Sequence, residues 1–258
     1  MNSNTDNNDN TKNIGAEDLP LISIITVVYN GVKTIEQTIH SVIRQPYQNK
    51  EYIIIDGGST DGTVDLIKKY ESNLSHWISE RDNGIYDAMN KGIGLAKGEL
   101  IGIINADDWY EENIFNIVAE QFRKIGSNHV IHGLLRNFLD EEFYSMVGNS
   151  IRKLRYDVIQ HPTCFIPLKL YNKYGNYNSK YKYSADYDLI LRFVNCGVQF
   201  FFIEKPIVNF RLGGISSIPE AEKEMYKVRV KHHLISKTEG TLRILFVQIS
   251  SFVKKFLK

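Results

Sequence analysis

Acidic side chains follow an apolar run near the middle of the chain. Residues 100–104 have the pattern of a short buried strand, and Asn105-Ala106-Asp107-Asp108 come directly after them. Carboxylates at the end of a buried strand are unfavourable unless a positive charge compensates them. A hard divalent cation binds one or two carboxylates and completes its shell with substrate phosphate oxygens. The cluster therefore predicts a site for a metal-bound phosphate. The structural alternative is a loop in which Asp108 caps the next helix.

Polar residues also end three other apolar runs in the N-terminal half. The first run ends at Tyr29 and Asn30, the second ends at Asp56, and Asp82 and Asn83 follow the third. The ligand crevice of open α/β sheets lies at the carboxyl ends of the strands, so we expect these groups to line one crevice. A tyrosine ring can stack on a nucleobase, and a carboxylate can accept a hydrogen bond from a pyrimidine imide. Together they predict a nucleotide site; a core role for Tyr29 and a turn at Asp56 are the alternatives.

Strand patterns alternate with helix patterns through the N-terminal half. Strands are expected at residues 21–30, 51–56, 76–80 and 100–104, and helices at residues 32–44, 63–70, 85–96 and 111–124. This alternation is typical of βαβ units. It predicts an α/β fold with a mostly parallel, Rossmann-like central sheet flanked by helices.

The pattern changes after residue 128. Strands are expected at residues 129–135, 138–147 and 163–166, and helices at residues 168–174 and 185–193. Residues 198–210 have the pattern of two strands separated at Pro206, because proline cannot donate a ladder hydrogen bond.

The two ends of the chain differ from its body. Residues 1–19 are rich in polar side chains, so we expect a disordered tail. Residues 216–258 are expected to form a C-terminal helical extension, with a charged helix at 219–237 and a basic amphipathic helix at 241–258. Basic helices with an apolar face can lie in a membrane interface. The alternatives are packing on this chain's own core or on a second copy in a homodimer.

Composition narrows the class of protein. The chain has 258 residues and a net charge of +1, which is ordinary for a globular protein and indicates no nucleic-acid partner. Cys164 and Cys196 lack metal-ligand spacing and are expected to be buried thiols in a reducing cytoplasm. The sequence shows no signal-peptide pattern and no apolar run near the ~20 residues of a membrane span. It also lacks a Walker loop and a dinucleotide fingerprint.

Six short blocks occur in order between residues 21 and 211. They are residues 23–30 (SIITVVYN), 54–63 (IIDGGSTDGT), 80–92 (ERDNGIYDAMNKG), 98–102 (GELIG), 105–108 (NADD) and 184–189 (SADYDL). Together these blocks resemble the family 2 glycosyltransferases of the GT-A fold. The most similar subgroup assembles bacterial capsule, exopolysaccharide or O-antigen. The resemblance implies one GT-A domain at residues 20–215, with a nucleotide-sugar-binding half at 20–126 and an acceptor half at 127–215.

The resemblance also implies a site and a reaction. A nucleotide-sugar donor, usually a UDP-sugar, would bind with Mn²⁺ or Mg²⁺; Asp107 takes the place of the metal ligand and Asp186 that of the catalytic base. The implied donor contacts are Thr26, Val28, Tyr29, Asn30, Asp56, Asp82, Asn83, Asn90, Asn105, Ala106, Asp107 and Arg211. Asp108, His161 and Asp188 are expected on the acceptor side or as supports. The implied reaction is inverting transfer of one sugar to a saccharide or lipid-linked saccharide acceptor in surface polysaccharide assembly.

Three positions depart from the family's pattern. Asn105 replaces the first Asp of the DxD motif, Gly57 replaces a frequent Asp at the base pocket, and Ala185 replaces the Glu beside the base. These changes leave a degenerate nucleotide-sugar-binding scaffold as an alternative. A sugar nucleotidyltransferase is another, although its glycine- and arginine-rich first loop is missing. The expected location is the cytoplasm, or the cytoplasmic face of the inner membrane if residues 241–258 bind lipid.

Overall fold

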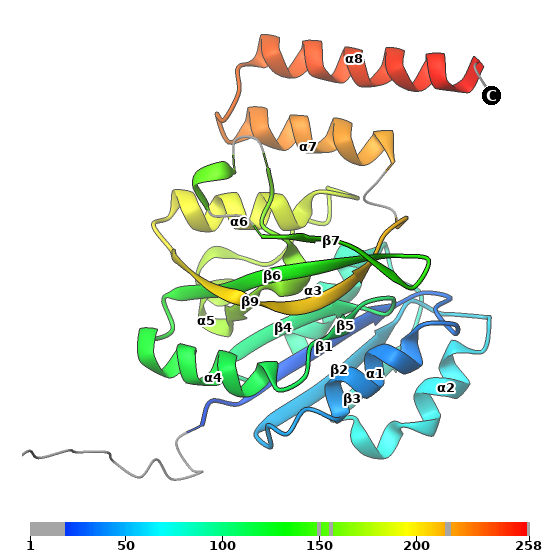
Figure 1. The fold of residues 1–258 in the computed structure, drawn as a ribbon, viewed down its shortest axis with the longest axis vertical. Coiled ribbons are helices and arrows are strands. Elements are labelled where there is room, and N and C mark those ends of the chain that lie inside the picture. Colours follow the sequence, from blue (N-terminus) through cyan, green and yellow to red (C-terminus); the bar gives the residue numbers. More distant parts are fainter. Residues whose placement is uncertain (1–18, 149–150, 155–156, 215–217, 257–258) are drawn as a thin grey trace, which may run out of the picture.

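The computed structural model describes residues 19–148, 151–154, 157–214 and 218–256. Within these residues, nine strands form one sheet in the order β3-β2-β1-β4-β8-β6-β9-β5, and β7 pairs with β6. Helices flank the sheet, and α6, α7 and α8 are stacked on one side of it (Figure 1). Residues 1–18 of the expected polar tail lie outside the described residues.

The N-terminal half of the sheet is parallel, as the sequence predicts. Its strands are β1 (Ile22–Val28), β2 (Lys50–Asp56), β3 (His76–Ser79) and β4 (Leu100–Asn105). Alternate residues of β1 point to opposite faces, so Ile25 and Val27 belong to one core cluster and Ile24 and Val28 to the other. Because both faces are covered, the strands are apolar nearly throughout.

Amphipathic helices cover the two faces. The helices of this half are α1 (Ile35–Ile43), α2 (Thr63–Lys69), α3 (Ile85–Leu95) and α4 (Ile114–Ile125). Ile39 of α1 and Phe115 of α4 pack in the cluster that contains Ile24, while Met89 of α3 packs in the cluster that contains Ile25. Apolar residues three or four positions apart give each helix one buried side. This arrangement confirms the expected α/β architecture.

The second half of the sheet has strands of both directions. It contains β8 (Phe165–Pro167), β6 (His129–Leu139), β7 (Glu142–Val147), β9 (Gln199–Arg211) and β5 (Trp109–Tyr110). β8 joins antiparallel to β4 and so links the halves, while β6 and β9 are parallel. β5 was not expected, because two residues are too few to show a periodicity. The helices here are α5 (Leu168–Tyr174) and α6 (Ala185–Asn195), with short 3-10 turns at Ile151–Lys153 and His161–Thr163. Another 3-10 turn, Glu71–Asn73, lies between α2 and β3 in the N-terminal half.

The expected pair of strands over residues 198–210 is wrong. β9 is one strand, and Pro206 lies where its pairing with β6 shifts register on both sides of Leu134. An irregularity of this kind leaves a position without a ladder hydrogen bond, so proline is tolerated there. A longer β9 carries Arg211 to the edge of the sheet where Asp107 lies.

The first C-terminal helix begins at Pro219 as predicted but ends before residue 237, and the second begins at residue 237 rather than 241. α7 spans Pro219–Lys231 and α8 spans Lys237–Phe256, with His233 in the left-handed region (φ 58°) at the turn between them. In the described part of the chain, no helix is both long and apolar enough to cross a bilayer. The expectation of two buried thiols holds for Cys164 but is wrong for Cys196, which is exposed after the end of α6.

Candidate active site at the carboxyl edge of the sheet

The register of the parallel strands brings the predicted polar groups to one edge. Val28 of β1 pairs with Asp56 of β2, which pairs with Ser79 of β3. On the other side of β1, Val27 pairs with Asn105 of β4. The loops that follow these four strands therefore emerge side by side, as the rule for open α/β sheets predicts.

Asp56 organises the turn after β2. It is fully buried, and one oxygen, Oδ2, accepts hydrogen bonds from the backbone N–H groups of Gly58 (3.0 Å) and Ser59 (2.9 Å) and from the Ser79 hydroxyl (2.7 Å). The Ser59 hydroxyl donates to Oδ1. A carboxylate with this many donors fixes the loop, so Asp56 forms the turn that its structural alternative predicts.

The loop after β1 is tied to the loop after β2. Tyr29 is 68% exposed at the edge, which its alternative as a half-buried core residue did not predict. Asn30 has a left-handed backbone (φ 52°), and its side-chain oxygen accepts a hydrogen bond from Thr60 N–H at 2.9 Å. Asp61 accepts from Val32 N–H (3.1 Å), a contact that the sequence reasoning missed. The result is a braced platform with an exposed ring.

Thr26 and Val28 lie inside the sheet rather than on its edge. The Thr26 hydroxyl is within hydrogen-bonding distance of the Tyr52 hydroxyl (2.9 Å), and both residues are buried. Val28 is also buried, and its carbonyl accepts the N–H of Gly57 (2.9 Å). Thr26 and Val28 are therefore buried, whereas Tyr29 beside them is exposed.

Asp82 lies against Gly57. A Cβ atom on Gly57 would be 2.5 Å from Asp82 Oδ2, so the carboxylate fills the space that a side chain at position 57 would need. The other oxygen, Oδ1, accepts from Gly84 N–H (2.8 Å). The neighbouring Asn83 donates its backbone N–H to the side chain of Asp87 (3.0 Å), which ties this loop to the first turn of α3.

The acidic cluster after β4 divides into two unlike carboxylates. Asp107 is partly exposed, and burial raises its pKa. Asp108 is fully buried; burial and then the charge of Asp107 raise its pKa well above the usual value, and Oδ1 accepts from Arg211 N–H at 3.2 Å. Among the described residues, Asn105 Oδ1 and Asp108 Oδ2 have no hydrogen-bond partner. Two buried oxygen acceptors beside a carboxylate fit a hard cation.

Arg211 braces this cluster from β9. Its guanidinium donates to the carbonyl of Asp107 and to Glu141 (2.9 Å), and it stacks 4.7 Å from the Trp109 ring centre. Ala106 is buried between the cluster and the first loop, 3.5 Å from where a Cβ on Gly31 would lie. In the described ranges, no three His, Cys, Asp or Glu side chains are grouped as metal ligands.

Asp186 is the second residue of α6 and stays partly exposed. The Tyr86 hydroxyl donates to its Oδ1 at 2.8 Å, across 100 residues of sequence. Burial, and then the charge of Asp186, raise the pKa of Tyr86 well above its usual value, so this phenol remains a donor. One oxygen of Asp186 is thereby held in place while its side chain remains accessible.

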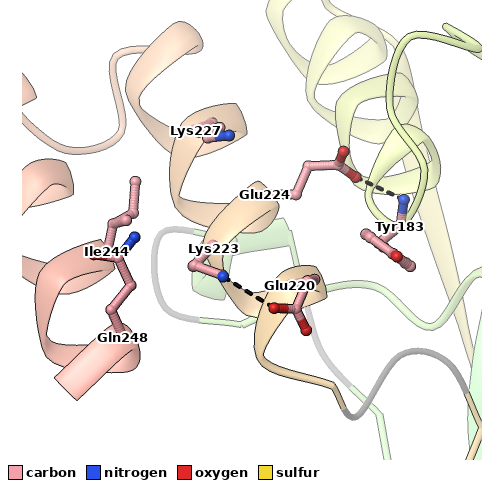
Figure 2. Close-up of a pocket in the computed structure, with 7 residues that line it drawn as sticks. All are labelled: Tyr183, Glu220, Lys223, Glu224, Lys227, Ile244 and Gln248. Carbon is pink, nitrogen blue, oxygen red and sulfur yellow. Dashed lines mark hydrogen bonds and ion pairs between the residues drawn. The ribbon is translucent and has the colours of Figure 1, made fainter. Parts of the chain in front are cut away.

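Glu224 of α7 holds the segment just before Asp186. Its carboxylate accepts the backbone N–H groups of Lys182 (3.0 Å), Tyr183 (2.6 Å) and Ser184 (2.9 Å). Figure 2 shows this carboxylate directed at Tyr183. The sequence reasoning missed Glu224, because nothing in a charged helix indicates which distant N–H groups one of its acids will meet.

A cavity of about 330 Å³ lies beside this contact, between α7 and α8. Its lining residues are Tyr183, Glu220, Lys223, Glu224, Lys227, Ile244 and Gln248 (Figure 2). It is separate from the strand-end edge and contains none of the predicted donor contacts.

His161 and Asn90 support the wall next to Asp186. His161 is buried with Nε2 2.7 Å from the Tyr177 hydroxyl; burial lowers its pKa, and the negative charge of Asp186 opposes that shift. Asn90 uses both ends of its amide on the Tyr177 backbone, at 2.9 and 3.0 Å. The Tyr86 and Tyr177 rings stack with centroids 5.6 Å apart. Both ends of the Asn90 amide are therefore bonded to the segment at Tyr177.

Asp188 has a different environment from Asp186, only two positions away. Its side chain is 1% exposed and contacts Arg192 (3.1 Å), Lys231 (2.8 Å) and His232 (2.9 Å). Burial alone would raise its pKa, but hydrogen bonds from His232 and Lys231 lower it to about 2. Asp188 thus joins α6 to the end of α7 and is not brought to the strand-end edge.

Comparison with known proteins agrees with this geometry. The sequence profile of Glycosyl transferase family 2 matches residues 23–201. The chain belongs to this family. Within it, a PGL/p-HBAD biosynthesis glycosyltransferase of Mycobacterium bovis BCG is 28% identical over 241 residues, covering 91% of this chain and 92% of the relative. An uncharacterized glycosyltransferase of Mycobacterium tuberculosis is 30% identical over 181 residues, covering 67% of this chain and 68% of the relative.

Solved glycosyltransferases share the fold. The structure of S. aureus TarS residues 1–349 in complex with UDP-GlcNAc has a TM-score of 0.66 at 17% identity. The match covers 86% of this chain and 70% of the TarS chain. The mannosyltransferase PcManGT of Pyrobaculum calidifontis, in complex with GDP-Man and Mn²⁺, has a TM-score of 0.66 at 15% identity, covering 90% and 70%. The predicted GT-A-type fold and glycosyltransferase class are therefore confirmed, which favours sugar transfer over the nucleotidyltransferase alternative.

Proposed function

We propose that this family 2 glycosyltransferase transfers a single sugar, with inversion, from a UDP-sugar to a hydroxyl of a saccharide or lipid-linked saccharide. The observation that carries the proposal is the accessible Asp186, whose Oδ1 is held by Tyr86 at 2.8 Å. Asp186 accepts the proton of the acceptor hydroxyl. At the same time, the oxygen of that hydroxyl bonds to the anomeric carbon of the donor sugar. The bond from that carbon to the donor phosphate breaks, and UDP leaves with the bonding electron pair. A general base of this kind contributes about 10²–10⁴-fold.

The donor base is assigned to the platform formed by the first two loops. Tyr29 offers an exposed ring for stacking. The acid missing at position 57 is supplied from the next loop by Asp82, whose carboxylate occupies that space. Asp56 keeps the platform in shape. Arg211, next to Asp107, is assigned to the diphosphate side.

Asp107, with the Asn105 and Asp108 oxygens that lack partners among the described residues, is assigned to a divalent cation. Such a cation would stabilise the negative charge of the leaving diphosphate. Asn105 in place of an acid leaves one less negative charge at the site. The related solved structures hold UDP-GlcNAc or GDP-Man, the latter with Mn²⁺, which supports a nucleotide-sugar donor and a cation. We assign the product to surface polysaccharide assembly in the cytoplasm or at its membrane face.

The test is thermal unfolding with UDP-, GDP-, CMP- and dTDP-sugars, each with Mn²⁺, Mg²⁺ or EDTA. A ligand that binds only the folded state raises the apparent stability, by about 2.7 kcal/mol at a hundred times its Kd. We expect UDP-sugars to stabilise the protein with metal and not with EDTA, and Asp107→Ala to lose the effect. Stabilisation by another nucleotide family alone would contradict the donor assignment.

Transfer itself is tested with Asp186→Asn, which keeps the shape of the side chain. We expect donor stabilisation to be unchanged and turnover, measured as UDP release and acceptor product, to fall about 10²–10⁴-fold. Asp188→Asn is the matched control on the same helix, and its remaining folded fraction should turn over normally. UDP-sugar binding without transfer or donor hydrolysis in the unmodified protein would instead favour the scaffold alternative.

A further inference from the structure

α8 carries a row of exposed apolar side chains. The row consists of Leu242, Leu245, Phe246, Ile249, Phe252 and Val253, whose exposed fractions range from 47% to 72%. Their spacing of three and four positions places them on one side of the helix. The other side packs on α7, where Val247 is buried and a Cβ on Gly240 would meet Val230 at 2.3 Å. α8 is the outermost layer of the helix stack in Figure 1.

The charge of this segment has one sign. From residue 240 to residue 258 the sequence contains Arg243, Lys254, Lys255 and Lys258 and no Asp or Glu. Arg243 lies 3.6 Å from Glu239, which precedes the segment. An apolar helix face with aromatic residues and flanking cations is the combination that binds anionic lipid surfaces.

We propose that the outer face of α8 binds the surface of a bilayer containing anionic phospholipids, with the helix axis in the membrane plane. The apolar row enters the boundary between head groups and acyl chains, and the net positive charge of the segment attracts the lipid phosphates. Since no described helix could cross a bilayer, the contact is a surface one. The proposal does not depend on the transfer reaction.

A second copy of the chain matches this face less well. If two α8 helices paired antiparallel about Ile249, Arg243 of one copy would lie opposite Lys255 of the other. In a parallel pair, each cation would lie opposite its own copy. Like charges at such positions are destabilising, and Glu239, which already pairs with Arg243, is the single acid in the sequence of α8. Charge complementarity therefore favours lipid phosphates.

The membrane would then lie two helix layers from Asp186. α8 packs on α7, and Glu224 of α7 holds the N–H groups that precede Asp186 in α6. With about 10 Å between packed helices, the bilayer surface is roughly 20 Å from the proposed base. A saccharide attached to a membrane lipid could span that distance, whereas the lipid itself would stay in the bilayer.

Sedimentation of the full-length protein with vesicles tests the proposal. One set of vesicles is pure phosphatidylcholine, and the other contains equal parts of phosphatidylcholine and phosphatidylglycerol. We expect at least about tenfold stronger binding to the anionic set, weakened by added salt. Equal binding to both sets, or binding to neither, would overturn it.

Matched variants identify the surface. Phe246→Ser with Ile249→Ser should reduce binding about tenfold or more, and Lys254→Gln with Lys255→Gln should reduce it and its salt dependence. Phe143→Ser with Tyr144→Ser is the control, because these residues are 58% and 64% exposed on β7, which belongs to the sheet and not to the helix stack. Unchanged thermal unfolding confirms that the variants fold. Full binding by the first variant, or a stable dimer in light scattering that the first variant dissolves, would overturn the proposal.

Discussion

At the scale of single residues, the molecule separates side chains that look alike in sequence. Asp186 and Asp188 lie two positions apart, yet one is accessible beside a tyrosine and the other is enclosed by cations. Asp107 and Asp108 are adjacent, yet only Asp107 is partly exposed. Burial and partners, rather than residue type, decide which acid can meet a substrate.

Gly57 and Asp82 provide a test at this scale. Gly57→Asp should weaken donor binding about tenfold, because the new side chain would be pressed against Asp82, whose Oδ2 lies 2.5 Å from where the added Cβ atom would be. Adding Asp82→Gly should restore much of the affinity, since a single acid then occupies the space. The measurement is the Kd for the donor by calorimetry. Additive losses in the double variant would show that the two positions do not share one space.

At the scale of elements, α7 determines how α6 presents its N-terminus. Glu224→Ala removes the acceptor for three N–H groups, so we expect a loss of about 1–2 kcal/mol of stability and about tenfold in kcat with little change in the donor KM. Glu224→Gln keeps an oxygen acceptor and should recover most of kcat. Glu220→Ala is the control. Glu220 lies one turn earlier on α7 and forms an exposed ion pair with Lys223, so its loss should leave kcat unchanged. A change in donor KM alone would contradict a positioning role.

Asp188 gives the second contact between α6 and α7. Its pKa of about 2 lies below the ordinary value of 3.8, so its stabilising effect is complete above pH 4 and is lost as the pH falls toward 2. Asp188→Asn should cost about 2–4 kcal/mol at neutral pH, because it leaves Arg192 and Lys231 without their buried counter-charge. Urea unfolding between pH 2 and 7 measures the free energy of unfolding of the unmodified protein and of Asp188→Asn. Below pH 4 the stability of the variant should depend less on pH. A parallel dependence in both proteins would contradict this role.

At the scale of the whole molecule, α8 is joined to the body through close packing on α7. Gly240→Ala should destabilise the protein by about 1–3 kcal/mol, since the added methyl would lie 2.3 Å from Val230. Gly94→Ala in α3 is the control: nothing lies within 4 Å of its added methyl, so it should gain about 0.5–1 kcal/mol. Thermal unfolding compares the two. Equal effects would contradict close packing of α8 on α7.

The sequence by itself determined the parallel half of the fold and the general position of the site. Runs of apolar residues and helical spacing are local patterns, and they located β1, β2, β4 and the helices between them. Because parallel strands end at one edge, the residues that follow them had to meet there. Tyr29, Asp82 and Asp107 could be selected on that ground.

Only the tertiary structure decided which of the selected residues are accessible and what holds them. The contact between Tyr86 and Asp186 spans 100 residues, and that between Glu224 and Ser184 spans 40. No periodicity encodes such pairs, because a pattern along the chain records which side of an element is buried and not what it is buried against. The same reason applies to β5, to the continuous β9 and to the side of α8 that remains exposed.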